Sequence, residues 1–114
     1  MYCVYSIVTS KHKKMDTGDL SEEAYNAIMI EAERFNHDLT LQFGLLSYHC
    51  ADEDDFIEKS IALINEIKKY DEIAIDDMFF GNPPRKEEFH KTLERILVNI
   101  RELKKIPIDK RNYD

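Results

Sequence analysis

Residues 21–50, SEEAYNAIMIEAERFNHDLTLQFGLLSYHC, decide the fold of this chain. At about 100° per residue, the apolar side chains return to one side of a helix, and the stripe keeps its phase through Asn36, His37 and Asp38. The stripe consists of Ala24, Tyr25, Ile28, Ala32, Phe35, Leu39, Phe43, Leu46 and Cys50. The pattern therefore predicts one unbroken helix over about 21–50, roughly 45 Å long at ~1.5 Å per residue.

The remaining helices are predicted to pack along this one. A helix over about 52–70 has an acidic start, with Asp52 as its N-cap, and lysines in its last turn. A helix over about 84–105 has a bundle-type seam, since its apolar residues recur at intervals of 4, 3, 4 and 3: Phe89, Leu93, Ile96, Ile100 and Leu103. A short helix over about 72–80 is expected to close one end. The predicted fold class is an all-α, small antiparallel helical bundle, because short loops make neighbouring helices antiparallel.

Length and composition indicate one globular domain. The chain has 114 residues, and its three glycines and three prolines are too few for the turns of a sandwich or barrel. We expect an N-terminal arm (residues 1–14), a helical bundle domain (residues 15–106) and a polar, extended C-terminal tail (residues 107–114).

The N-terminal arm, MYCVYSIVTSKHKK, is apolar and then basic, the reverse of a signal peptide. It is predicted to be extended, and to lie on the bundle or pair with a second copy. Alternatively, Met15 is the true start of the protein. No apolar run reaches the roughly 18 residues of a membrane span. Two cysteines, Cys3 and Cys50, are too few for a disulfide scaffold, which favours a reduced, cytoplasmic setting.

Two local signals bear on the predicted long helix. Its start has two interpretations, an acidic capping box of Asp19 and Glu22, or a Ser21 cap. Gly44 is its weak position, because glycine costs about 1 kcal/mol relative to alanine inside a helix. This glycine is expected to mark the close approach of another helix.

A second apolar stripe predicts a contact, made either by the N-terminal arm or by another subunit. Ile30, Leu41 and Tyr48 lie about 140–160° from the centre of the main stripe, with His37 beside them. Val98 points away from the seam of the 84–105 helix. The outer side of a monomer's surface helix should be polar. These five residues are the predicted partner interface.

The uneven charge suggests what kind of partner this is. The net charge is −7, and residues 15–83 carry seventeen acidic against four basic side chains, while both ends of the chain are basic. An acidic body steers a basic partner. The leading hypothesis is a non-enzymatic interaction protein that self-associates, binds a basic protein, or does both.

None of the metal-binding patterns in the sequence predicts a site. The Glu87-x-x-His90 spacing is that of di-iron bundles, but Glu87 faces water on the helix. Glu33 and His37 lie one turn apart, away from the main stripe. His49, Cys50 and Asp52 supply only one cluster, whereas zinc sites join two. Asp52–Asp55, with Asp76 and Asp77, lack the alternation and central glycine of a calcium loop.

No catalytic residue or cofactor is predicted either. The chain has neither a Gly-x-Ser-x-Gly elbow nor a glycine-rich phosphate loop. An enzyme-like or ligand-binding bundle remains an alternative, and it would need an internal pocket. The polar side chains placed to line such a pocket are Tyr25, Tyr48, His49, Tyr70 and His90.

A nucleic-acid-associated regulator is the third hypothesis. Its basic groups would be Lys11, Lys13 and Lys14 at one end and Arg101, Lys104, Lys105, Lys110 and Arg111 at the other. The acidic middle of the chain opposes this hypothesis, since it repels phosphate.

Overall fold

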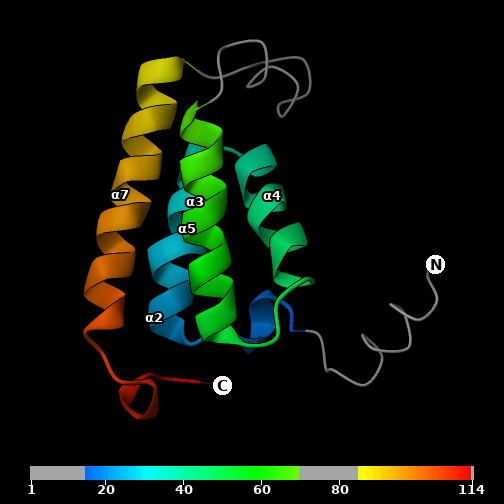
Figure 1. The fold of residues 1–114 in the computed structure, drawn as a ribbon, viewed down its shortest axis with the longest axis vertical. Coiled ribbons are helices and arrows are strands. Elements are labelled where there is room, and N and C mark those ends of the chain that lie inside the picture. The colour runs from blue at the N-terminus through cyan, green and yellow to red at the C-terminus, as the bar shows by residue number, and fades with distance from the viewer. Residues whose placement is uncertain (1–14, 70–84, 114) are drawn as a thin grey trace, which may run out of the picture.

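The computed structural model describes residues 15–69 and 85–113, which fold into an antiparallel helical bundle (Figure 1). In chain order, the helical elements are η1 (Thr17–Asp19), α2 (Glu22–Ala24), the π-helical turn η2 (Tyr25–Ile30), α3 (Glu31–Phe35), α4 (His37–Ser47), α5 (Glu53–Lys69), α7 (Lys86–Lys104) and η3 (Ile108–Lys110). Because α2, η2 and α3 run on without interruption, residues 22–35 form one helical segment, called here the first segment. The predicted all-α fold is confirmed.

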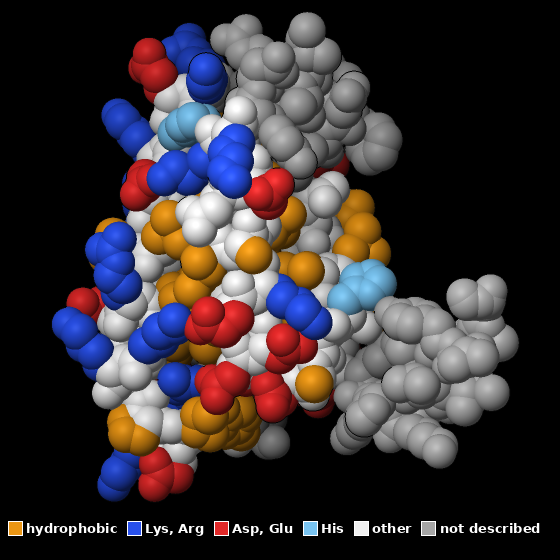
Figure 2. Space-filling view, in the orientation of Figure 1, with side chains coloured by type: hydrophobic (Ala, Val, Ile, Leu, Met, Phe, Trp, Pro, Cys, Tyr) orange, Lys and Arg blue, Asp and Glu red, His pale blue; other side chains and the backbone are white. Residues whose placement is uncertain are grey.

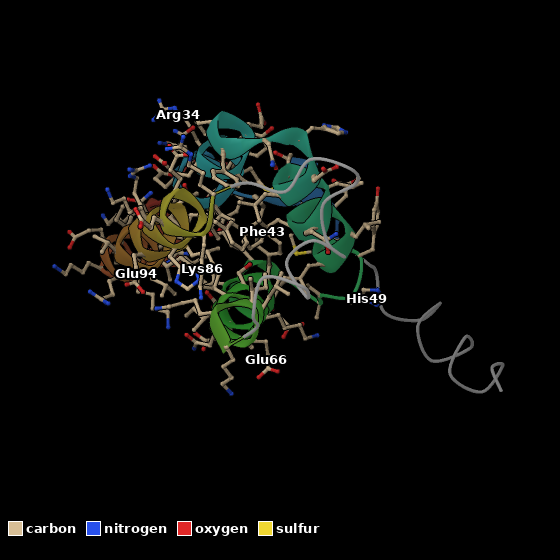
Figure 3. All side chains as sticks on the ribbon, turned by 90° about the horizontal axis from the view of Figure 1, so that it is seen from above. Arg34, Phe43, His49, Glu66, Lys86 and Glu94 are labelled. Carbon is tan, nitrogen blue, oxygen red and sulfur yellow. The ribbon has the colours of Figure 1, made fainter. Side chains whose placement is uncertain are left out.

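The four long segments form a ring. Figure 1 shows the first segment and α5 running upward and α4 and α7 running downward. The first segment contacts α4 and α7, and α5 contacts the same two helices. In the view from above, α4 and α7 therefore lie diagonally opposite (Figure 3). Among the described helices, none has the length and apolar content that a membrane span requires.

The predicted single helix over residues 21–50 is wrong, because the chain breaks at Asn36 and turns back on itself. The backbone of Asn36 is extended, with φ −169° and ψ 171°. Its N–H donates to the Ala32 carbonyl at the end of α3 (3.0 Å), and its side-chain oxygen accepts the N–H of Leu39 in α4 (2.9 Å). One asparagine thus ends one helix and caps the next, and asparagine is a preferred N-cap residue.

Each half of the apolar stripe lies on the core-facing side of its own helix. Periodicity shows which residues share a face within a helix, and it does not test whether the helix is continuous. Ile28 and Ala32 in the first segment and Leu39 and Phe43 in α4 are all fully buried. A straight rod cannot pack its two halves together, whereas the turn buries apolar surface from both, which favours the turn.

The cap at Asn36 makes a direct prediction. Replacing it by alanine (Asn36→Ala) should lower the free energy of unfolding by about 1 kcal/mol, because the Leu39 N–H loses its acceptor. Asn36→Asp keeps an acceptor oxygen and should leave stability nearly unchanged. Urea denaturation followed by circular dichroism measures both. Equal stabilities for the alanine and aspartate variants would show that the cap does not hold this turn.

Local signals in the first segment are partly confirmed. Of the two predicted starts, Ser21 is the N-cap, since its Oγ accepts the Ala24 N–H at 3.1 Å. The π-helical turn η2 was not predicted. Asn99 of α7 donates from Nδ2 to the Ala27 carbonyl in this turn (3.1 Å), which ties α7 to the first segment.

The other two predicted long helices are confirmed as α5 and α7. Asp52 caps α5 as expected, with its Oδ1 accepting the Asp55 N–H at 2.9 Å. The seam of α7 is buried along its whole length, and Phe89 at its start stacks on Phe35 of α3, with ring centroids 5.4 Å apart. The largest fully buried side chains are Ile28, Leu39, Phe43, Phe56, Ile57, Ile64, Ile67, Phe89, Leu93, Ile96 and Ile100. The predicted arm over 1–14 and the short helix over 72–80 lie outside the described residues.

The C-terminal segment was expected to be an extended polar tail. Most of its residues are exposed, but hydrogen bonds of Arg111 and Asn112 tie it to the base of the bundle. It forms the 3₁₀ turn η3, after which Arg111 is buried with only 9% of its surface exposed. The Arg111 guanidinium donates from Nε to the Ile106 carbonyl (2.9 Å) and from Nη2 to the Leu103 carbonyl (3.2 Å). It therefore binds one carbonyl in the last turn of α7 and one just beyond the end of that helix.

A buried ion pair joins this tail to two helix starts. Arg111 Nη1 lies 2.6 Å from Glu53 Oε2, and both side chains are about 95% buried (4% and 5% exposed). Glu53 Oε1 accepts the Ser21 N–H (2.5 Å), and its Oε2 also accepts the hydroxyls of Ser21 (3.1 Å) and Tyr113 (3.0 Å). The Glu53–Arg111 pair thus connects the starts of the first segment and α5 with the end of α7.

Candidate functional site

Helix α4 has two apolar faces, and only one of them is covered by the described chain. Leu39 and Phe43 point into the core and are fully buried; Figure 3 shows Phe43 between the helices. On the other side Leu41, Leu45 and Tyr48 are 41%, 52% and 52% exposed. Their spacing of four and three residues puts them on one side of the helix. We call these three residues the α4 outer face, and Figure 2 shows apolar side chains at the edge of the molecule over α4.

The α4 outer face lies in the longest uncharged stretch of an otherwise highly charged chain. Residues 39–51 contain no Asp, Glu, Lys or Arg, although 34% of the whole chain is charged. His37, two residues before this stretch, and His49, within it, are both exposed. A contiguous apolar patch without charge is characteristic of a contact surface rather than of a solvated one.

Gly44 lies on the same side of α4, three residues after Leu41 and four before Tyr48. A Cβ atom built on Gly44 meets nothing within 4 Å, so packing within the chain does not require a glycine there. Glycine in a helix interior still costs about 1 kcal/mol relative to alanine. The predicted close approach of another helix to Gly44 is therefore not made within the described chain.

The predicted partner interface does not form one surface. His37, Leu41 and Tyr48 share the outer side of α4. Ile30 belongs to the first segment, beyond the turn at Asn36, and is half-buried. Val98 is 46% exposed on α7, diagonally across the bundle from α4. The contact role of these residues stays a prediction.

Leu45 is a member of the α4 outer face that the sequence pattern did not single out. On one continuous helix over residues 21–50, Leu45 would lie between the two apolar stripes. A signal was nevertheless present, because Leu41 and Leu45 are one turn apart in a stretch with no charged residue.

The residues proposed for an internal ligand pocket are not brought together. The Tyr25 hydroxyl donates to Glu33 (3.0 Å) at the surface, and this hydrogen bond raises the pKa of Tyr25. His49 points outward beyond the end of α4 (Figure 3), and Tyr48 is exposed beside it. His90 lies at the other end of the bundle; its Nε2 is buried without a hydrogen-bond partner among the described residues. Tyr70 lies outside the described residues.

Two of the residues considered as metal ligands, Cys50 and Asp55, make other contacts, and Asp76 and Asp77 lie outside the described residues. Within residues 15–69 and 85–113, no three His, Cys, Asp or Glu side chains converge closely enough to hold a metal ion. Burial raises the pKa of the Cys50 thiol to about 11, and the thiol donates to the Leu46 carbonyl (3.3 Å). It is therefore neutral, whereas metal binding and nucleophilic attack need the thiolate. Asp55 accepts the Ala51 N–H (2.9 Å) and pairs with Lys59 (3.0 Å).

Several basic side chains near the C-terminal end form ion pairs with acidic side chains. Arg111 is buried with Glu53 and is not part of a basic surface. Lys104 pairs with Glu58 (2.7 Å) and Lys105 with Glu102 (3.0 Å). These pairs weaken the case for a phosphate-binding face, which needs basic charge gathered on one side.

Comparison with known proteins yields no relative, because no protein-family model, no curated protein and no solved structure matches this chain.

Proposed function

We propose that this protein is a non-enzymatic interaction protein that self-associates by packing the α4 outer face against the same face of a second copy. The observation that carries the proposal is the exposure of Leu41, Leu45 and Tyr48 in the uncharged stretch 39–51. A two-fold symmetric contact brings the same patch of both copies together. Leucine and tyrosine side chains suit the centre of such a contact.

The lack of charge on the α4 outer face makes it a surface on which two acidic copies can meet. With a net charge of −7, two copies repel each other over most of their surfaces. The α4 outer face lets two chains meet without opposing carboxylates at the centre of the contact. Gly44 supports the same arrangement, because the distance between two packed helices depends on the size of the side chains at their contact.

The double variant Leu41→Glu/Leu45→Glu tests the proposal. A symmetric contact would bury four glutamates without partners, so the dimer should weaken by at least about 100-fold. Sedimentation equilibrium of the unmodified chain at about 0.1–1 mM should give twice the monomer mass of 13.5 kDa, and the variant should give the monomer mass. Val98→Glu is the matched control, since it adds a charge to an exposed apolar site on the diagonal helix, and it should still dimerise.

Gly44→Ala separates folding from association. Alanine should stabilise the monomer by up to about 1 kcal/mol through helix propensity, because its Cβ meets open space. The same methyl group should weaken the dimer if two α4 helices meet at Gly44. A monomeric mass for the unmodified chain at all concentrations, or equal loss of dimer in the Val98 variant, would rule out this contact.

A further inference from the structure

A pocket lies at the base of the bundle, where the start of α5 meets the segment before the first helix and the C-terminal segment. Its volume is about 380 Å³, within the range of pockets that bind small groups. Its apolar wall is formed by Met15, Ile108 and Tyr113, and its acidic rim by Asp19, Asp52 and Asp54. Figure 2 shows apolar side chains directly below a group of acidic ones at this end of the molecule.

Two of the three side chains of the apolar wall are exposed. Ile108 and Tyr113 are 47% and 44% exposed, whereas Met15 is buried. Burial and the hydrogen bond to Glu53 raise the pKa of Tyr113, so its ring remains a neutral phenol. That hydrogen bond also holds the ring in place, 3.0 Å from Glu53 Oε2.

Among the described residues, the acidic rim carries more negative charge than the cations in contact with it balance. None of the described lining residues is a lysine or arginine. The nearest cation, Arg111, is bound to Glu53, and it lies 3.8 Å from Asp54 Oδ1. Within residues 15–69 and 85–113, Asp19 and Asp52 accept only backbone N–H groups, from Asp16 (3.0 Å) and Asp55 (2.9 Å). The rim therefore attracts a further positive charge.

We propose that this pocket binds an arginine side chain from a basic segment of a partner protein. The methylene stem of arginine suits the wall of Met15 and Ile108, since long cationic side chains bury their stems on apolar surface. Its planar guanidinium can stack on the Tyr113 ring and form paired hydrogen bonds with the rim carboxylates. A lysine ammonium offers neither the stacking nor the paired geometry.

The proposal deepens the suggestion that this is an interaction protein, because it names a partner chemistry, and it uses a surface other than α4. The proposed self-association through α4 and the proposed arginine pocket can fail separately. The Leu41→Glu/Leu45→Glu variant should retain the pocket, and changes to the rim should leave the α4 outer face intact.

An NMR titration of the full chain, labelled with ¹⁵N, tests the inference. The probe is a pentapeptide with arginine at its second and fourth positions and glycine elsewhere. Its binding should shift the amide signals of Asp19, residues 51–54 and Tyr113. A matched peptide with citrulline in place of arginine has the same shape without the charge, and it should bind at least about tenfold more weakly.

Variants of the rim and the wall sharpen the test. The triple variant Asp19→Asn/Asp52→Asn/Asp54→Asn should weaken peptide binding by about tenfold, since each exposed charge pair contributes modestly. Asparagine preserves the helix cap at Asp52. Tyr113→Ala should also weaken binding, whereas Tyr113→Phe keeps the ring and should bind like the unmodified chain.

The control variant Glu66→Gln/Glu87→Gln/Glu88→Gln removes the same number of exposed carboxylates from the other end of the bundle. It should leave peptide binding within about twofold of the unmodified chain, because these charges are far from the pocket. Equal weakening by the rim and control variants, equal binding of the citrulline peptide, or no shifts near the pocket would overturn the proposal.

Discussion

Arg111→Ala is expected to lower the free energy of unfolding by about 3–5 kcal/mol. The substitution leaves the Glu53 carboxylate buried without its cation, and an unpaired buried charge is strongly destabilising. It also removes the donors to the carbonyls of Leu103 and Ile106. Urea denaturation monitored by circular dichroism gives this difference directly.

Two further variants separate the buried charge from the loss of a side chain. Arg101→Ala removes an exposed arginine of α7 and should change stability by less than about 0.5 kcal/mol. Adding Glu53→Gln to Arg111→Ala removes the unpaired charge but keeps an acceptor for Ser21, so the double variant should be more stable than Arg111→Ala alone. If Arg111→Ala cost no more than Arg101→Ala, the C-terminal segment would not be held by this pair.

Phe43→Ala should cost about 3–5 kcal/mol, because it opens a cavity at the centre of the bundle. Leu45→Ala, two residues away on the α4 outer face, should cost less than about 0.5 kcal/mol in dilute solution. The contrast follows from the two faces of α4, which have the same apolar character and opposite surroundings. Chemical denaturation at about 1 µM measures both variants below the concentration at which association matters.

The same pair of variants also examines self-association. Binding to the folded state raises apparent stability with protein concentration. The unmodified chain should therefore become more stable between about 1 µM and 1 mM, and Leu45→Ala should reduce this gain. A large cost of Leu45→Ala in the dilute monomer would mean that the leucine is covered within its own chain.

Most of the helical content could be predicted from sequence because its signals are local. The seam of α7 follows from the spacing of its apolar residues, and the start of α5 from Asp52 and the carboxylates after it. The turn at Asn36 could not be recognised, since an asparagine can lie inside a helix or cap one. The choice depends on packing between the first segment and α4, which the sequence of either one does not contain.

The candidate surfaces divide in the same way. Leu41 and Tyr48 could be selected from sequence because they are apolar residues on the side of a surface helix that is expected to be polar. The pocket at the base could not be predicted, because it combines Met15, the start of α5 and the C-terminal segment. Arg111 was counted among surface cations for the same reason: its partner, Glu53, is far away in sequence and adjacent in space.

The amino-acid sequence by itself determined that this protein is a small antiparallel helical bundle, since apolar periodicity and helix caps are properties of neighbouring residues. Only the tertiary structure decided that residues 21–50 form two helices, that Arg111 is a buried partner of Glu53, and which apolar side chains of α4 face solvent. The physical reason is that burial is a property of the whole fold. The side of a helix that loses contact with water is chosen by the elements packed against it.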